Sequence, residues 1–279
     1  MISAMMKVIL PTDFSDNSWK AMTYAAQLYS NIPCQFYILN TYNVPHGYTD
    51  VGVIQNFEPL KEESEEGLAL MLGRFNELDH HNDSKVETIS RFASLVDTIN
   101  ELEKKDPNSF VVVMGTRGAT GIGELFLGTM TSHVIEHTSS PVICVPNVAE
   151  LSVPESIMLA VDKDGVDRRS EIAPLLQLAQ DRNAHIKVVN VPENEEVLFG
   201  EDSPEVFVID HYLDGISHSY YNLSGEYKED TLTSSAEKDK IDLIAMIKRD
   251  RGFWKNLFHR SLTKSMSFHS DIPLLILRD

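Results

Sequence analysis

The segment of the sequence best suited to chemistry is a glycine-rich stretch that follows the apolar run FVVV. Five glycines stand between Gly115 and Gly128, and a helical pattern begins at Thr129. Glycine lets a backbone approach a ligand closely and adopt positive φ. The first N–H groups of a helix attract anions. Hydroxyl groups at Thr131 and Ser132 stand in the same helical turn. This combination predicts a site for a phosphate group.

Residue spacing separates three kinds of phosphate-binding loop. A P-loop requires G-x-x-x-x-G-K-[ST], and this glycine-rich segment contains no lysine. A dinucleotide fingerprint requires G-x-G-x-x-G directly after the first strand. Here the third glycine of that pattern is missing, and the segment follows a later strand. A third pattern, Gly115-x2-Gly118-x9-Gly128-Thr129, is complete.

Together with ILPTDFSDNS near the N-terminus and SSPVICVP further on, this glycine spacing resembles the ATP-binding branch of the universal stress protein family. The resemblance covers nearly the whole chain and is stronger in its first half. It implies an adenine nucleotide, ATP or AMP or ADP, with or without Mg²⁺. By similarity, Asp13 and the backbone at Thr41 would meet the adenine, with Gly115 and Arg117 on the ribose side. The residues implied in binding are Pro11, Thr12, Asp13, Thr41, Met114, Gly115, Arg117, Gly118, Gly128, Thr129, Met130 and Thr131.

Strand-like and helix-like patterns alternate along the chain. In the first half, strands are predicted at 7–11, 34–42, 85–92, 109–115 and 141–146, with helices around 19–29, 58–78, 96–104 and 129–138. Such alternation is typical of an α/β fold with a mostly parallel sheet and helices on both faces. Ligands of these sheets bind at the carboxyl ends of the strands. Asp13, Thr41 and Gly115, which all stand near such ends, are therefore expected to converge. Taken alone, an aspartate after a strand, such as Asp13, is more often a helix cap or turn residue than a ligand contact.

The second half of the chain repeats the first. Glu155–Asp164 matches the first strand, and an offset of 132 residues carries Leu125 onto Leu257 and Pro141 onto Pro273. This predicts two tandem doubly wound domains, at 1–148 and 153–279, each with a five-stranded sheet, the second degenerate. Between its second and fourth strands the second copy is eroded. Residues 193–205 and 219–240 are predicted there as loop, short helix and variable surface.

The second copy has lost the glycines of the motif. At the 132-residue offset, Ile247 replaces Gly115, while Asp250 and Arg260 replace the other two. Since each change adds bulk where the backbone would meet a ligand, the second copy is predicted not to bind ATP. The basic segment Lys248–Lys264 is either a solvated face or a docking patch for an acidic partner.

Composition limits the classes of partner. The chain has 279 residues and a net charge of −18, which argues against nucleic-acid and acidic-membrane binding. The N-terminus lacks a signal-peptide pattern, so a cytoplasmic protein is expected. The two cysteines are expected to be core thiols. The histidines in 79–83 and 210–218 lack structural-zinc spacing, and no catalytic or metal-binding residue is predicted.

The function expected from these features is that of an ATP-binding stress-response or regulatory protein. The first domain would hold the nucleotide, and the second would serve as a scaffold or docking module. By resemblance, the two domains would pair through their last strands, VICVP and LLILR. A nucleotide-independent interaction protein and a slow ATPase are the alternatives, and hydrolysis would need a positioned base and a metal. A further homodimer and the protein partner are left open.

Overall fold

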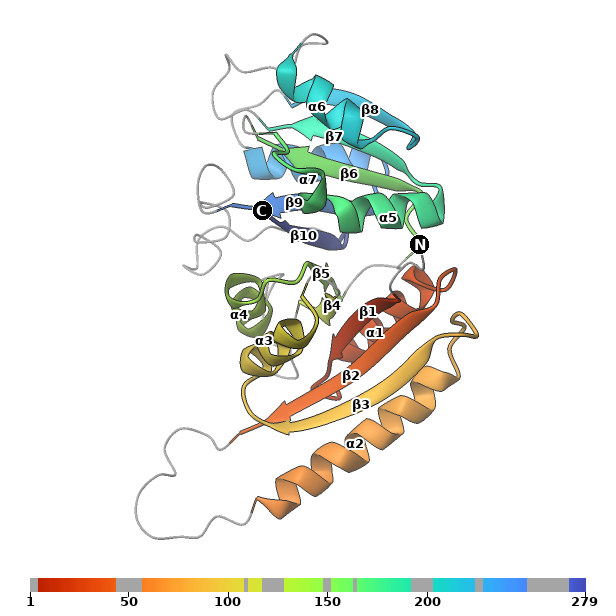
Figure 1. The fold of residues 1–279 in the computed structure, drawn as a ribbon, viewed down its shortest axis with the longest axis vertical. Coiled ribbons are helices and arrows are strands. Elements are labelled where there is room, and N and C mark those ends of the chain that lie inside the picture. The colour runs from red at the N-terminus through yellow and green to blue at the C-terminus, as the bar shows by residue number, and fades with distance from the viewer. Residues whose placement is uncertain are drawn as a thin grey trace, which may run out of the picture.

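The structure, a computed structural model, describes residues 5–43, 57–107, 110–116, 128–147, 152–162, 165–191, 203–223, 228–249 and 271–279. The strands form one continuous sheet in the order β3-β2-β1-β4-β5-β10-β9-β6-β7-β8. Figure 1 shows the first half of the chain at the bottom and the second half at the top, with β5 and β10 where they meet.

The first half alternates strands and helices as predicted. Its elements are β1 (Met6–Pro11), α1 (Asp16–Leu28), β2 (Cys34–Tyr42), α2 (Glu58–Asn76), β3 (Lys85–Phe92), α3 (Leu95–Lys105), β4 (Phe110–Gly115), α4 (Thr129–His137) and β5 (Val142–Val145). All of the pairs within the order β3-β2-β1-β4-β5 are parallel. This arrangement confirms the doubly wound α/β class.

The second half repeats this order of strands. Its elements are β6 (Ser156–Val161), the 3₁₀ turn η1 (Arg169–Glu171), α5 (Ala173–Arg182), β7 (His185–Asn190), α6 (Pro204–Tyr212), β8 (His218–Asn222), α7 (Lys228–Lys238), β9 (Leu243–Lys248) and β10 (Leu274–Arg278). The pairs in the order β10-β9-β6-β7-β8 are again parallel.

The expectation of an eroded middle in the second copy was wrong in part. Within residues 203–223 and 228–240 the structure has α6, β8 and α7, in the same order as α2, β3 and α3. The strand was missed because β8 has only five residues, HSYYN, and lies at the sheet edge with little apolar content. Residues 192–202 lie outside the described part of the chain.

The last strands of the two halves join the sheet. β10 pairs with β5 in antiparallel fashion, with Leu275 opposite Ile143 and Ile276 opposite Val142. The predicted pairing through VICVP and LLILR is therefore present within the chain. Since hydrogen bonds run across this junction, neither β5 nor β10 is an edge strand.

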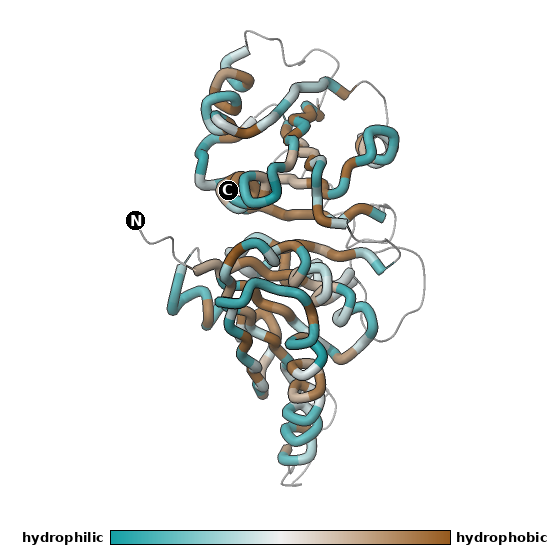
Figure 2. Tube along the Cα trace, turned by 90° about the vertical axis from the view of Figure 1, so that its right-hand side faces the viewer, coloured by the Kyte–Doolittle hydropathy of each residue, from teal (hydrophilic) through white to brown (hydrophobic). Residues whose placement is uncertain are grey.

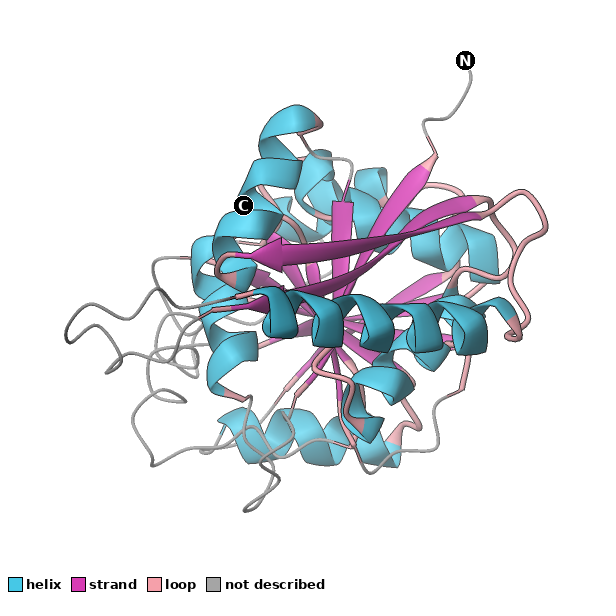
Figure 3. Ribbon diagram, turned by 90° about the horizontal axis from the view of Figure 1, so that it is seen from below, coloured by secondary structure: helices cyan, strands magenta, loops and turns pink. Residues whose placement is uncertain are grey.

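Each face of the sheet carries one hydrophobic core, and both cores include residues of both halves. One core packs against α1, α2 and α5, and the other packs against α3, α4 and α7. Figure 3 shows helices on both sides of the strands, and Figure 2 shows hydrophobic residues gathered in the strands. Alternate residues of one strand therefore serve different cores, as Val8 and Ile9 do.

The two cysteines lie in these cores. Cys34 and Cys144 are buried free thiols, as predicted. Burial raises the pKa of each thiol from 9.0 to about 12, so both are neutral at physiological pH. Within the described residues, no helix is both long and apolar enough to cross a membrane.

Candidate functional site

A crevice opens at the carboxyl ends of β1, β2 and β4. It lies where the chain turns to opposite faces of the sheet, since α1 packs on one core and α4 on the other. The crevice has a volume of about 340 Å³. The residues that line it are Pro11, Thr12, Asp13, Ser18, Leu39, Asn40, Thr41, Leu95, Met114, Gly115, Gly128, Thr129, Met130 and Thr131.

This lining includes every residue of the predicted binding set that the structure describes. Arg117 and Gly118 of that set lie outside the described residues. Sequence reasoning missed four lining residues, Ser18, Leu39, Asn40 and Leu95. The first stands in the first turn of α1, two are neighbours of Thr41 on β2, and the last begins α3. Their places beside strand ends were a usable signal, because such positions meet at the same edge of the sheet.

The turn between β1 and α1 is held by a network of short hydrogen bonds. The Asp13 Oδ1 atom accepts from the Ser15 backbone N–H at 3.1 Å and from its hydroxyl at 2.5 Å. Ser15 is in turn the N-cap of α1, and its hydroxyl oxygen accepts from the Ser18 N–H at 3.2 Å. Phe14 adopts a φ of 64° inside this turn. Asp13 thus holds the capping residue Ser15 in place, and its side chain is exposed at the crevice.

The end of β2 is tied to the end of β1. The Asn40 side-chain amide donates to the Thr12 carbonyl at 2.7 Å, and the Thr12 N–H donates to the Leu39 carbonyl at 2.8 Å. Asn40 is buried, with 8% of its surface exposed. These bonds fix the ends of β1 and β2 relative to each other, and so fix the positions of Asp13 and Thr41 in the crevice.

Packing within the protein by itself requires a glycine at position 115. A Cβ atom at this position would lie 2.2 Å from Asn17 Nδ2 and 3.0 Å from the Asn17 backbone oxygen. The residue therefore lets α1 lie close against the end of β4. Thr131 is bonded to the same end of β4, because its hydroxyl donates to the Gly115 carbonyl at 2.9 Å. The Thr131 hydroxyl proton is thus engaged within the protein.

The N-terminus of α4 opens into the crevice without a side-chain cap. Gly128 is its N-cap residue, with an extended ψ of 152°. The Gly128 N–H donates to the Thr116 carbonyl at 2.6 Å, and Ser132 makes the first intrahelical bond to Gly128 at 2.9 Å. The N–H groups between them therefore lack intrahelical partners. Thr129 and Met130 are exposed at this end. Such an end suits an anion, because the helix dipole and the N–H groups face it together.

In the second half, an arginine occupies the carboxyl ends of β6 and β9, the strands that correspond to β1 and β4. Arg249 follows β9 as Arg117 follows β4, at the offset of 132 residues. Its Nη1 lies 3.4 Å from Asp162 Oδ1, and its Nη2 lies 3.4 Å from Glu171 Oε2 and 3.0 Å from the Gly165 carbonyl. Exposure is only 3% for Arg249, 1% for Asp162 and 3% for Glu171.

This ion cluster gives Asp162 a role that the sequence did not predict. Asp162, which follows the first strand of the second half as Asp13 follows the first strand of the first half, pairs with Arg249. Ile247, which replaces Gly115, is a core residue with 2% exposure. Asp250 and Arg260 lie outside the described residues, as does the basic segment beyond Arg249.

Metal ligands do not gather in the described parts of the chain. No group of three or more histidine, cysteine or acidic side chains with metal-binding geometry is present among those residues. His80 and His81 bond to their own turn, and His218 pairs with Asp210 at 2.9 Å.

The fold and the crevice define a tandem doubly wound α/β protein with its site at the topological switch point. The chain belongs to the universal stress protein family, whose sequence profile matches residues 5–146. It is 28% identical over 142 residues to a universal stress protein of Methanocaldococcus jannaschii, covering 50% of this chain and 81% of that protein.

Two solved structures share the whole arrangement. A universal stress protein from Archaeoglobus fulgidus superposes with a TM-score of 0.71 at 17% identity, covering 98% of this chain and 96% of that one. A putative universal stress protein from Pseudomonas aeruginosa gives a TM-score of 0.55 at 12% identity, covering 99% and 94%. At these identities the likeness concerns the fold.

Proposed function

We propose that the crevice of the first half, in a domain spanning residues 1–148, binds one adenine nucleotide, with ATP as the preferred ligand. The observation that carries this proposal is the uncapped N-terminus of α4 opening into the crevice. A phosphate at that end would accept hydrogen bonds from backbone N–H groups and gain from the helix dipole. These fixed groups act locally, so they can hold an anion in a chain whose net charge is −18.

The rest of the crevice suits the adenosine part of the ligand. Its volume of about 340 Å³ falls within the range of about 300–1,000 Å³ usual for ligand pockets. Leu39, Leu95 and Met114 offer apolar contact, while Asp13 and the Thr41 backbone offer polar atoms for a base. Mg²⁺ would reach the site with the phosphates.

Binding is proposed rather than turnover. Among the described residues that line the crevice, Asp13 is the one with an ionisable side chain. Its Oδ1 atom is already an acceptor for Ser15. Hydrolysis requires a group that orients water towards the γ-phosphate, together with a metal ion. The nucleotide is therefore proposed as a regulatory ligand in a stress-response protein, one that changes the surface offered to a protein partner.

The second half, residues 153–279, is proposed to bind no nucleotide and to act as a scaffold or docking module. The buried cluster of Arg249, Asp162 and Glu171 supports this part of the proposal, since it stands at the end of β6 and β9. A ligand phosphate there would have to displace a buried guanidinium from two carboxylates.

The proposal is tested by calorimetric titration of the whole chain with ATP, ADP and AMP. The expected stoichiometry is one nucleotide per chain. Gly128→Arg, which introduces the residue found at the equivalent position of the second half, should abolish binding. Gly73→Arg is the matched control, because a Cβ atom added at this position of α2 meets no atom within 4 Å.

Three outcomes would contradict the proposal in different ways. A stoichiometry near two would show that the second half also binds. Unchanged binding by a folded Gly128→Arg variant would remove the phosphate assignment. If none of the three nucleotides produces heat or raises the melting temperature, the alternative of a nucleotide-independent interaction protein is favoured.

A further inference from the structure

We infer that the second half helps to position the nucleotide crevice of the first half. Its basic side chains bind the C-terminal ends of α1 and α4, the helices whose N-terminal ends line the crevice. The residues are Arg182 at the end of α5, Lys248 at the end of β9 and Arg278 at the end of β10. They are positioning residues, since none of them lines the crevice. The inference rests on the proposed function and adds a role for the second half.

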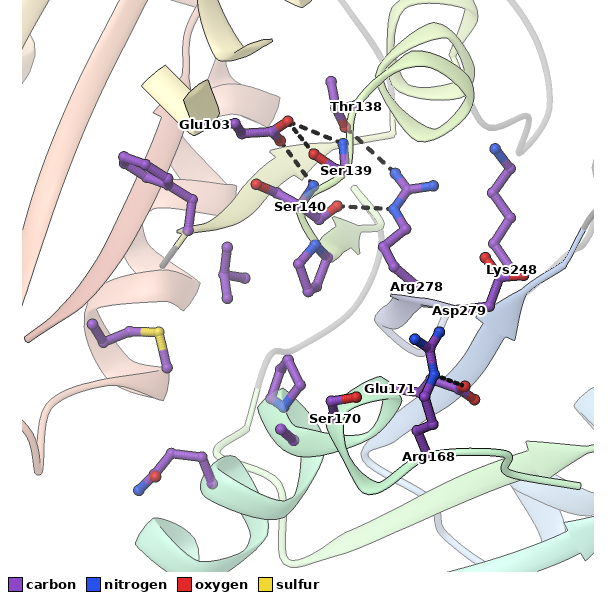
Figure 4. Close-up of a pocket in the computed structure, with 17 residues that line it drawn as sticks. Glu103, Thr138, Ser139, Ser140, Arg168, Ser170, Glu171, Lys248, Arg278 and Asp279 are labelled. Carbon is purple, nitrogen blue, oxygen red and sulfur yellow. Dashed lines mark hydrogen bonds and ion pairs between the residues drawn. The ribbon is translucent and has the colours of Figure 1, made fainter. Parts of the chain in front are cut away.

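Arg278 and Lys248 hold the C-terminal end of α4. The Arg278 guanidinium donates to the Ile135 carbonyl at 2.6 Å, to the Ser140 carbonyl at 3.0 Å and to the Thr138 hydroxyl at 3.4 Å. The Lys248 ammonium donates to the Glu136 carbonyl at 3.3 Å. Figure 4 shows Arg278 reaching from its strand to the turn at Thr138 and Ser140.

The same turn is held from the other side by its own half. One carboxylate oxygen of Glu103 on α3 accepts from the Ser139 N–H at 3.1 Å and from its hydroxyl at 2.6 Å. The other oxygen accepts from the Ser140 N–H at 2.8 Å. Figure 4 shows Glu103 and Arg278 on opposite sides of this turn. The turn that ends α4 is therefore hydrogen-bonded on one side to a carboxylate of the first half and on the other side to a guanidinium of the second half.

Arg182 holds the C-terminal end of α1 in a comparable way. Its Nε donates to the Leu28 carbonyl at 2.9 Å, and its Nη2 lies 2.6 Å from the same carbonyl and 3.1 Å from the Ser30 hydroxyl. The Gln27 carbonyl is a further acceptor for Nη2. Neither α1 nor α4 has a basic residue of the Lys or Arg type in its own last turn.

These contacts satisfy the groups that a helix leaves unpaired. The last four carbonyls of a helix have no intrahelical partner, and its C-terminus carries partial negative charge. A cation placed there stabilises the helix and fixes its position. Burial lowers the pKa of Arg278 to about 10, so its guanidinium remains charged at neutral pH.

The opposite ends of the two helices held in this way line the crevice, as does Leu95 at the start of α3. Ser18, in the first turn of α1, and Thr129, at the start of α4, both line it. The helices have 13 and 9 residues, so they span about 20 Å and about 13 Å between the crevice and the second half. Because a short helix moves as a rigid body, a change at one end shifts the other.

Polar contacts matter here because the halves are not closely packed beside α4. A cavity of about 720 Å³ lies between them, lined by Pro141 and Ser140 on one side and by Ser170 and Pro174 on the other. Arg278 and Lys248 line this cavity and donate to carbonyls of α4. Their loss would remove the side-chain donors to the Ile135 and Glu136 carbonyls, while Asn100 of α3 would still donate to the His137 carbonyl at 3.1 Å.

The test uses four arginine variants of the full chain, one of them a control. Arg278→Ala and Arg182→Ala should each weaken nucleotide binding, on the order of three- to tenfold, with an unchanged stoichiometry. Arg278→Lys should recover part of the loss, because it keeps the charge but not the forked donors. Arg168→Ala is the matched control. Arg168 lines the same cavity and bonds to Glu171 of its own half at 3.2 Å, so nucleotide affinity should not change.

A second measurement does not depend on nucleotide. In the ligand-free chain, Arg278→Ala should speed amide hydrogen exchange at residues 128–132, at the crevice end of α4, while Arg168→Ala should not. If exchange at this end is unchanged in a folded Arg278→Ala variant, the inference is overturned. It is also overturned if wild type binds nucleotide and both alanine variants bind equally well. If wild type binds none but the exchange effect is present, the proposed function fails and the positioning role stands.

Discussion

At the scale of single residues, Gly115 shows how one position can serve packing and binding together. Its missing side chain brings α1 against β4, and its carbonyl holds the Thr131 hydroxyl. The sequence motif alone suggested contact with a ligand. The structure adds a cause inside the protein, namely the amide of Asn17.

Gly115→Ala is expected to destabilise the protein even without ligand. The new Cβ would overlap Asn17 Nδ2, at 2.2 Å, and overpacking of this kind costs about 1–3 kcal/mol. Asn17→Ala in the same chain should relieve the side-chain part of the clash and leave the contact of 3.0 Å with the backbone oxygen of residue 17. Urea unfolding of the two single variants and the double variant measures the effect. A double variant less stable than the sum of the single changes would contradict this account.

Arg249 is expected to be among the most sensitive residues of the second half. Arg249→Ala would remove the buried cation that Asp162 and Glu171 share, and breaking a buried ion pair typically costs about 3–5 kcal/mol. Arg168→Ala is a suitable comparison, because its side chain is 66% exposed although it pairs with the same Glu171. Thermal unfolding should show a large loss for the first variant and a small one for the second. Comparable losses would contradict a special role for the buried cluster.

At the scale of elements, periodicity predicted most strands and helices closely. Residues 34–42 and 85–92 are strands over the predicted spans. The start of α1 was less visible, because the helix begins at Asp16 after its Ser15 cap, while the apolar pattern begins only at Trp19. Strand β8 has few apolar residues, since a strand at the sheet edge has less to bury.

The part of the site that depends only on the order of the strands could be predicted from the sequence. Residues at the ends of β1, β2 and β4 must meet in a doubly wound sheet, so Asp13, Thr41 and Gly115 could be placed together. Contacts between distant side chains could not be predicted. Arg278 lies in sequence far from Ile135, and only the antiparallel pairing of β5 with β10 brings them together.

The N-cap of α1 is expected to contribute to the crevice as well as to stability. Ser15→Ala removes both the cap and a donor to Asp13, so it should cost about 1 kcal/mol and weaken nucleotide binding. Ser203 caps α6 in the second half by the same type of bond. Ser203→Ala should therefore lower stability similarly and leave binding unchanged. Equal effects of the two variants on nucleotide affinity would contradict the assignment of the crevice.

At the scale of the whole molecule, the two halves share one sheet and two cores. Each core contains residues of both halves, and β5 and β10 lie where they meet. A boundary at which few contacts cross would let the halves unfold separately. Here the continuous sheet favours unfolding as one unit, with nucleotide bound to the first half stabilising the second as well.

The strand junction is the place to test this coupling. Leu275 is 1% exposed on β10 opposite Ile143, so Leu275→Asp should cost at least about 3 kcal/mol and weaken the joint between the halves. Calorimetry of the wild type should give a single transition, which ATP moves as a whole to higher temperature. The variant should give two transitions, of which ATP moves one. Leu70→Asp on α2 is the control, since Leu70 is 71% exposed and its loss should leave the single transition intact. Two transitions in the wild type itself would mean that the shared sheet does not couple the halves.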